Sequence, residues 1–221
     1  MAGKKGLKEA VECASGSTPW DLGNQVLYDL CSKYPCHKED QAILAKVWLI
    51  GRSYAAAIER RRPDDMEKKE DNDDFYIQTV LPKIKQSAID QWIEGLKKYQ
   101  SPTTESLNDI LTVHANVTNL FAEISNLQKR SLASKYLHFH LRELFFIYDT
   151  RAVSKINRLS GFLNFQKSNS NNENIDKHDH EYHEFVEKCL HLQSYIENQF
   201  SIFLNPRQID NLLLMDIECT I

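Results

Sequence analysis

Apolar residues recur every three or four positions along most of this chain, a spacing that predicts amphipathic helices. Helix-starting residues such as Thr18-Pro19 and Asn205-Pro206 precede several of these runs. The predicted helices cover residues 7–14, 18–34, 40–61, 75–99, 101–124, 135–141, 149–159, 184–200 and 205–215. The helix over residues 75–99 is predicted to be broken or kinked at Pro82. Only seven glycines and six prolines are present, so we predict an all-α protein of roughly eight to ten helices in two halves around a cleft.

Two polar segments interrupt the helical pattern. Asp64–Asp74 holds seven acidic residues and two lysines, and Gln166–Asp179 is a low-complexity segment rich in Asn and Ser. Neither has enough apolar residues to join a core, so both are predicted to be mobile polar loops. We predict that residues 1–221 form a single helical unit with these two interruptions.

The most apolar of the predicted helices is Asp40–Arg61, with a proline just beyond its end. Lys46 and Arg52 interrupt its apolar positions, which makes it too charged to span a membrane. Because its other positions are apolar nearly all round, it is predicted to lie at the centre of a globular core. A guanidinium in such a helix must be paired or open onto a cleft. Arg52 is therefore predicted to form either an ion pair or a substrate contact, and Tyr54 to be a pocket wall or core residue.

The segment Lys129–Leu159 centres on one carboxylate. Asp149 follows the apolar run Leu144–Tyr148 and opens a stretch whose apolar positions recur at helical spacing. It is thus predicted to cap a helix N-terminus, where it accepts from backbone N–H groups and the helix dipole keeps it ionised.

The same stretch is unusually basic for an acidic protein. Between Asn126 and Leu159 there are seven basic residues and two acidic ones, although the whole chain carries a net charge of −4. Phosphate binding depends on such a local patch rather than on the total charge, so the patch indicates a polyanion site. A solvated helix face is the alternative interpretation.

Within this stretch the residue order resembles the helix-hairpin-helix DNA glycosylases of the endonuclease III superfamily. Their pattern reads L-P-G-V-G-x-K-T-A, a helix, then V-D-T-H-x-x-R-V-x-x-R. Arg130-Ser131-Leu132-Ala133 matches x-K-T-A, Tyr148-Asp149-Thr150-Arg151 matches V-D-T-H, and Arg158 falls at the second arginine. Two departures matter: Ser131 stands where lyase members carry a Schiff-base lysine, and the hairpin glycines are missing.

The resemblance implies cleavage of an N-glycosidic bond on a base flipped out of DNA, with Asp149 stabilising the oxocarbenium-like sugar and activating water. Without the lysine, the enzyme would be monofunctional unless Lys129 or Lys135 reaches the site. The implied phosphate contacts are Lys129, Arg130, Lys135, Arg151 and Arg158. The candidates for the substrate pocket, opposite the Asp149 helix, are Arg52, Tyr54, His138 and His140.

The sequence is also compatible with other classes of function. The missing lysine and glycines favour a non-catalytic protein that binds nucleic acid or another protein. A helical ribonuclease is a minor alternative, because Arg130 and His138 miss the R-x4–6-H spacing of that family. His178, His180 and His183 lack a second ligand pair at zinc spacing, so we expect no metal and no cofactor.

The number and spacing of the cysteines indicate the cellular compartment of the protein. The five cysteines are an odd number without a CxxC pair, and no apolar leader segment precedes a cleavage site. We therefore expect a cytoplasmic protein with reduced thiols, with DNA as its partner and no membrane association. Neither the oligomeric state nor the excised base can be predicted from the sequence.

Overall fold

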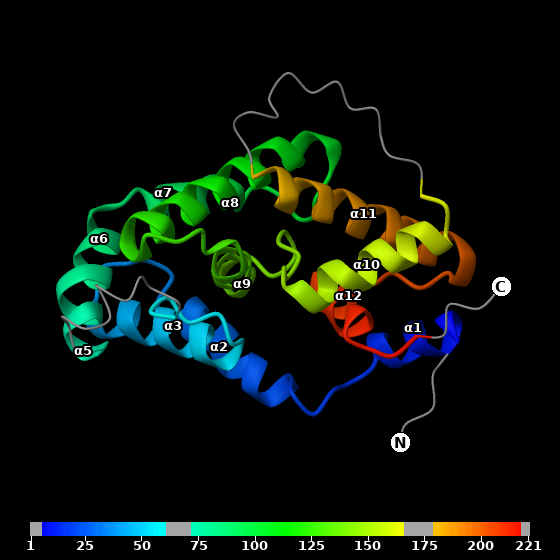
Figure 1. Cartoon of the computed structure of the whole chain (residues 1–221), viewed down its shortest axis with the longest axis horizontal. Coiled ribbons are helices and arrows are strands. Elements are labelled where there is room, and N and C mark those ends of the chain that lie inside the picture. Colours follow the sequence, from blue (N-terminus) through cyan, green and yellow to red (C-terminus); the bar gives the residue numbers. More distant parts are fainter. Residues whose placement is uncertain (1–5, 61–71, 166–178, 218–221) are drawn as a thin grey trace. The chain divides into compact units, whose positions relative to one another are not determined.

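The computed structural model describes residues 6–60, 72–165 and 179–217. Within these ranges every regular element longer than one residue is a helix, which confirms the predicted all-α class (Figure 1). The predicted loop Asp64–Asp74 lies largely outside these ranges, as does Gln166–Asp179, but residues 72–74 are helical, so the loop prediction was wrong for them. None of the described helices is both long and apolar enough to cross a membrane.

The chain divides into two compact units. An internal unit comprises Leu22–Phe145, and a terminal unit comprises Met1–Asp21 together with Phe146–Ile221. The terminal unit thus joins segments from both ends of the chain, a pairing that the hydrophobic pattern did not predict. The predicted cleft between two halves stays a prediction.

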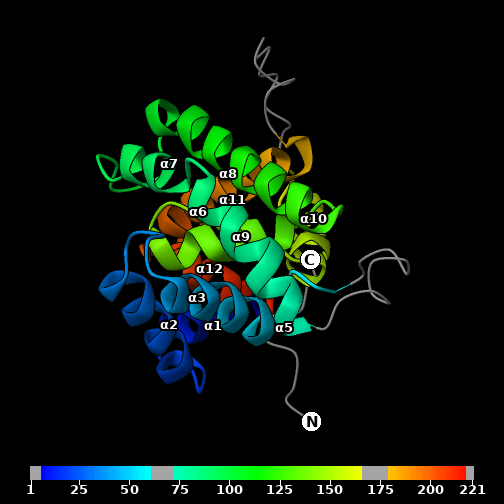
Figure 2. The same ribbon diagram turned by 90° about the vertical axis from the view of Figure 1, so that its left-hand side faces the viewer.

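The internal unit is built around α9 (Arg130–His140). Eight consecutive residues of α9, Leu132 to Phe139, are buried, so this helix is covered on all sides. It packs against α3 (Asp40–Ser53) and α8 (Thr104–Ser125). The other helices of this unit are α2 (Asp21–Lys33), α5 (Asn72–Phe75), the π-helix η1 (Tyr76–Val80), α6 (Leu81–Gln86) and α7 (Ile89–Leu96). Figure 2 shows α6 in front, where it contacts both α3 and α8.

Helix α3 is shorter and less central than predicted. It ends at Ser53 rather than at Arg61, and Trp48 on its outer face is 47% exposed. The chain turns back at Ala55, which adopts the left-handed conformation, and the Ala56 N–H donates to the Gly51 carbonyl at 2.8 Å. A Cβ at Gly51 would lie 3.0 Å from the Ala57 Cα, so the close return of the chain favours glycine there. Tertiary packing here overrides the helix propensity of three successive alanines.

The predicted helix 75–99 is interrupted twice. The π-helix η1 ends at Val80 and α6 begins directly at Leu81, so the chain departs from α-helical geometry in the turn before Pro82, near the predicted break or kink. The helical path is interrupted again at Ser87, which is extended, and resumes at Ile89. The second interruption was not predicted.

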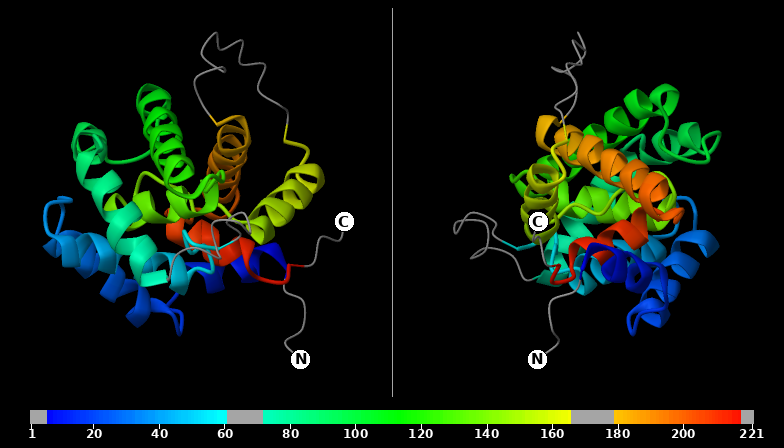
Figure 3. Two further views of the ribbon diagram at one scale, coloured as in Figure 1. Left: turned by 60° about the vertical axis from the view of Figure 1, so that its left-hand side comes forward. Right: turned by 90° about the vertical axis from the view of Figure 1, so that its right-hand side faces the viewer.

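The terminal unit contains α1 (Leu7–Ser15), α10 (Thr150–Phe162), α11 (His180–Phe200) and α12 (Pro206–Leu213). Helix α12 packs against both α1 and α10, and α10 packs against α11 (Figure 3). Asn205 caps α12 by accepting from the Gln208 N–H at 2.9 Å, as its Asn-Pro start predicted. The Gln208 side chain donates in turn to the Ser15 carbonyl at 3.1 Å, which ties the end of α1 to the start of α12.

Candidate functional site

Asp149 occupies the N-cap position of α10. Its backbone is extended, its Oδ1 accepts from the Ala152 N–H at 2.9 Å, and its carbonyl accepts from the Val153 N–H at 2.9 Å. The side chain is half-buried. The predicted capping role of Asp149 is therefore confirmed. The apolar face that follows, including Ala152, Ile156 and Leu159, is fully buried and fixes this helix in the terminal unit.

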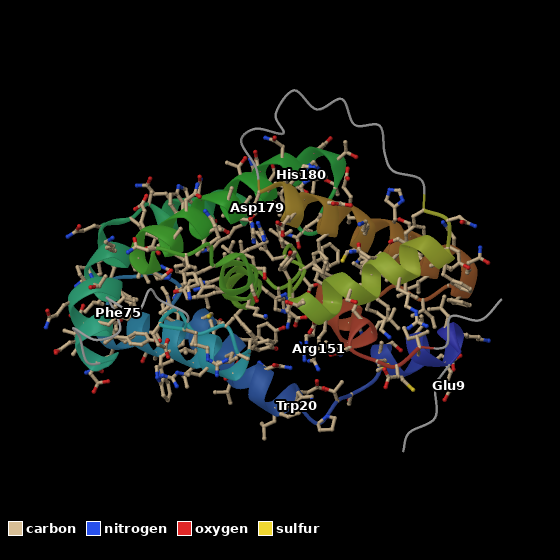
Figure 4. All side chains as sticks on the ribbon, viewed as in Figure 1. Glu9, Trp20, Phe75, Arg151, Asp179 and His180 are labelled. Atoms are coloured by element: carbon tan, nitrogen blue, oxygen red, sulfur yellow. The ribbon has the colours of Figure 1, made fainter. Side chains whose placement is uncertain are left out.

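Helix α10 presents a basic face to solvent. Arg151, Lys155 and Arg158 are spaced by four and three residues, which places them on one side of the helix. Arg151 and Arg158 are exposed and Lys155 is half-buried, with Arg151 near the N-terminal end of the helix (Figure 4). None of the three is paired with a residue that the structure describes, and the helix itself contains no acid. This arrangement leaves three cationic groups available to a polyanion.

The start of α9 differs from that of α10. Lys129 precedes the helix, and its ammonium donates to the Arg60 carbonyl, while Arg130 is half-buried. The turn from α8 to α9 contains no glycine. Instead Asn126 takes the left-handed position at a φ of 57°, which asparagine tolerates better than most residues. The two helices are thus joined by a short turn, built on asparagine rather than on the hairpin glycines.

Lys135 does not belong to the basic surface that the sequence predicts. It is 2% exposed, and its Nζ donates to the Ser131 hydroxyl at 2.7 Å and lies 5.9 Å from the centre of the Tyr54 ring. A phosphate contact at Lys135 would require this buried arrangement to open. The charge pattern predicted an exposed lysine. A helix buried on all sides can nevertheless carry a lysine when a polar partner, here Ser131, lies one turn away.

Tyr54 and His138 are held by the core rather than presented to a ligand. The Tyr54 hydroxyl donates to Asn24 Oδ1 at 2.7 Å, and its ring meets Phe139 edge-on at 5.4 Å. His138 Nδ1 donates to the Phe145 carbonyl at 2.8 Å, while the Tyr28 hydroxyl donates to Nε2 at 2.6 Å. Both ring nitrogens of the buried His138 are therefore satisfied, so its expected role in a substrate pocket is not supported.

Arg52 forms the ion pair that was one of its two predicted roles. Its guanidinium pairs with Glu59, which is buried and also accepts from the Tyr76 hydroxyl at 2.7 Å. Burial and the Glu59 carboxylate raise the pKa of Tyr76, so its hydroxyl keeps the proton that it donates. Since Arg52 itself is exposed, a substrate contact at its outer face stays a prediction.

A hydrogen-bonded chain of polar groups in the internal unit, two of them buried, is not indicated by the sequence pattern. Asp90 Oδ1 lies 2.5 Å from His37 Nδ1, and His37 Nε2 lies 2.5 Å from the Tyr136 hydroxyl. Burial, reinforced by the charge of Lys46, lowers the pKa of His37 to about 4, whereas burial raises the pKa of Tyr136. Tyr136 therefore donates to a neutral imidazole, which donates in turn to the Asp90 carboxylate.

Lys46 lies beside this chain and is fully buried. Its Nζ donates to the Tyr34 carbonyl at 2.9 Å and the Cys36 carbonyl at 3.4 Å. Burial lowers the pKa of Lys46 to about 8. The signal available in the sequence was a lysine within the most apolar helix, although nothing in the pattern indicated that its partners would be backbone carbonyls.

His140 is the predicted pocket residue that lines a pocket of the internal unit. Its ring lies 5.3 Å from that of His37 and 5.1 Å from that of Tyr136, and its Nε2 is buried without a hydrogen-bond partner among the described residues. Burial lowers the pKa of His140 well below its ordinary value, so the imidazole is neutral at pH 7. The pocket beside it has a volume of about 540 Å³.

Comparison with known proteins gives no further guide. No family model, curated protein or solved structure matches this chain.

The histidine cluster gives no metal centre in the described part of the chain. His178 lies outside that part, and His180 is exposed near the N-cap Asp179 at the start of α11 (Figure 4). His183 is buried, with its Nε2 3.6 Å from Glu187 Oε1. No group of three or more metal-ligating side chains is formed by the residues that the structure describes.

Proposed function

We propose that the protein binds DNA through α10 and hydrolyses the N-glycosidic bond of a damaged or modified base, with Asp149 as the catalytic carboxylate. One observation carries this proposal: the helix that Asp149 caps exposes a cationic face, formed by Arg151, Lys155 and Arg158, that is not paired with any described residue. The assignment of the reaction comes from the resemblance to helix-hairpin-helix glycosylases.

The chemistry requires a fixed negative charge near a developing positive one. When the C1′–N bond breaks, the base leaves with the bonding electrons and takes up a proton, and the sugar becomes an oxocarbenium-like cation. Asp149 would stabilise that cation and accept a proton from the water whose oxygen bonds to C1′. The capping bond to Ala152 holds the carboxylate in place, while Arg151 and Arg158 would bind phosphates flanking the extruded nucleotide.

The proposed enzyme is monofunctional. The resemblance places Ser131 at the position of the lyase lysine, and the Lys135 amine reaches the Ser131 hydroxyl, but that amine is buried and hydrogen-bonded. We therefore expect an intact abasic site as product, cleaved only by added alkali. Borohydride trapping of a protein–DNA adduct that disappears in Lys135→Met would refute the monofunctional part alone.

The decisive experiment is incubation with duplexes that carry different modified bases, followed by mass spectrometry of released base and abasic DNA. The wild-type protein should release base from at least one duplex, and Asp149→Asn should lower the rate by orders of magnitude at unchanged DNA affinity. Asparagine keeps the cap but removes the charge. Base release that persists in Asp149→Asn would contradict a catalytic role for this carboxylate.

A non-catalytic nucleic-acid-binding function is the second candidate. Its supporting observation is that Asp149 already has a structural role, since Oδ1 caps α10 as an asparagine could. DNA binding without base release from any duplex of the panel would favour this candidate. Absence of DNA binding at low salt would exclude both.

A further inference from the structure

The pocket beside His140 combines apolar, neutral polar and cationic walls. It lies in the internal unit, has a volume of about 540 Å³ and is lined among others by Tyr28, Cys31, Lys97, Phe139, His140 and Arg142. That volume lies within the range of small-molecule sites. None of these residues belongs to α10, so the pocket is independent of the proposed DNA-binding face.

The inner wall suits a planar ring. The rings of Tyr28 and Phe139 lie 4.8 Å apart at 48°; Phe139 is buried, so the half-buried Tyr28 ring supplies the aromatic surface. Cys31 adds a neutral thiol, because burial raises its pKa to about 12. His140 adds a neutral imidazole, whose Nε2 is covered by the protein and is not accessible from the pocket. A planar aromatic ligand can therefore contact this wall through the face of its ring.

The outer wall suits an anion. Lys97 and Arg142 line this pocket and also a neighbouring pocket of about 210 Å³. Of their present partners, Glu94 is largely exposed and Glu143 is half-buried. Exposed ion pairs of this kind contribute little, so a ligand anion can replace them at small cost. The one carboxylate at the larger pocket, Asp29, accepts from Gln25 at 2.7 Å.

We propose that this pocket binds an aromatic anion of mononucleotide size. Its ring would lie against Tyr28, and its phosphate or carboxylate would lie between Lys97 and Arg142. A nucleoside monophosphate and an aromatic carboxylate share this chemistry. The proposal does not rest on the proposed function, because it involves neither Asp149 nor DNA.

Isothermal titration of the full-length protein tests the ligand class. The probes are the common nucleoside monophosphates and indole-3-carboxylate, with adenosine and inorganic phosphate as partial ligands. We expect one of the two complete classes to bind at least about tenfold more tightly than either partial ligand, because ring and anion contacts act together. If neither the nucleoside monophosphates nor indole-3-carboxylate bind more tightly than adenosine and inorganic phosphate, the proposal is overturned.

Matched variants test the location. Lys97 and Lys98 are adjacent and exposed, but Lys97 alone of the two lines the pocket. Lys97→Met should weaken binding about tenfold, the effect of losing one charge-assisted hydrogen bond, whereas Lys98→Met should not. The exposed pocket residue Ser32 offers a steric test, since Ser32→Trp should block the ligand without disturbing the core. Equal weakening by both lysine variants, or normal binding by Ser32→Trp with an unchanged melting temperature, would refute this site.

Discussion

Two buried residues of the internal unit govern how its stability should respond to pH. Lys46 and His37 lie in the same cluster, and burial disfavours the charged form of each. Their partners differ: Lys46 donates to backbone carbonyls, whereas His37 links a carboxylate to a phenol. The two residues should therefore act in separate pH windows.

Lys46 should make the protein more stable as pH rises from about 8 to 10.5. Its pKa is about 8 in the folded protein, against an ordinary lysine value of 10.5 in an unfolded chain. Across this window the unfolded state binds more protons, so the free energy of unfolding increases, by roughly 3 kcal/mol in all. Burial raises the pKa values of Cys31, Tyr136 and Tyr182, which opposes this rise at alkaline pH, so the informative quantity is the difference between the wild type and Lys46→Met. In urea unfolding between pH 7.5 and 10.5 the wild type should gain stability relative to Lys46→Met. The same pH dependence in both proteins would contradict the assignment.

His37 should destabilise the protein as pH falls. Its pKa is about 4 in the folded protein against 6.5 in an unfolded chain, so stability is intact above pH 6.5 and is lost as pH approaches 4. The loss amounts to roughly 3 kcal/mol, and His140, whose pKa is also lowered, adds to it. His37→Gln should flatten this dependence in thermal unfolding between pH 4 and 7. A slope as steep as that of the wild type would show that other groups dominate.

At the scale of the element, substitutions at the N-cap of α10 distinguish the effect of the Asp149 hydrogen bond from the effect of its negative charge. The Asp149 carboxylate contributes a hydrogen bond to Ala152, which asparagine can also provide and alanine cannot. Asp149→Asn should therefore change the free energy of unfolding by a few tenths of a kcal/mol, while Asp149→Ala should cost about 1 kcal/mol. Chemical denaturation of the three proteins measures this. If both variants are equally destabilised, the negative charge rather than the cap stabilises the helix.

The basic face of α10 gives a second prediction at this scale. Arg151 and Arg158 are exposed and are not paired with any described residue, so each should contact one phosphate when duplex DNA binds. Replacing either with alanine should lower the slope of log affinity against log salt by about one unit. Fluorescence anisotropy at several salt concentrations measures the slope. Lys8→Ala, at an exposed position of α1, is the control and should leave it unchanged.

At the scale of the whole molecule, each unit has its own core, and α9 is the most enclosed element of the internal unit. Because residues 132–139 are all buried, opening their backbone hydrogen bonds requires disrupting α3 and α8 as well. Hydrogen exchange measured by mass spectrometry should therefore be slowest in α9 and much faster in α5, which has four residues. Exchange in α9 as fast as in α5 would show that this core opens locally.

Much of the fold could be predicted because helix formation is encoded locally. Periodic apolar positions gave the helical class, and the caps at Asp149 and Asn205 were identified from residue type and the run that follows. Helix ends were less predictable, as at Ser53, because the close return of the chain over Gly51 is decided by packing and not by helix propensity.

The sequence by itself determined the helical class, the caps and the basic face of α10, since each depends on residues a few positions apart. Only the tertiary structure decided which polar residues are buried and with which partners. Lys135 and Arg151 look alike in sequence, yet one donates to Ser131 in the core and the other is exposed. The contact between His37 and Tyr136 joins residues 99 positions apart. No local pattern encodes such a pair, because burial and partner choice depend on how distant helices pack.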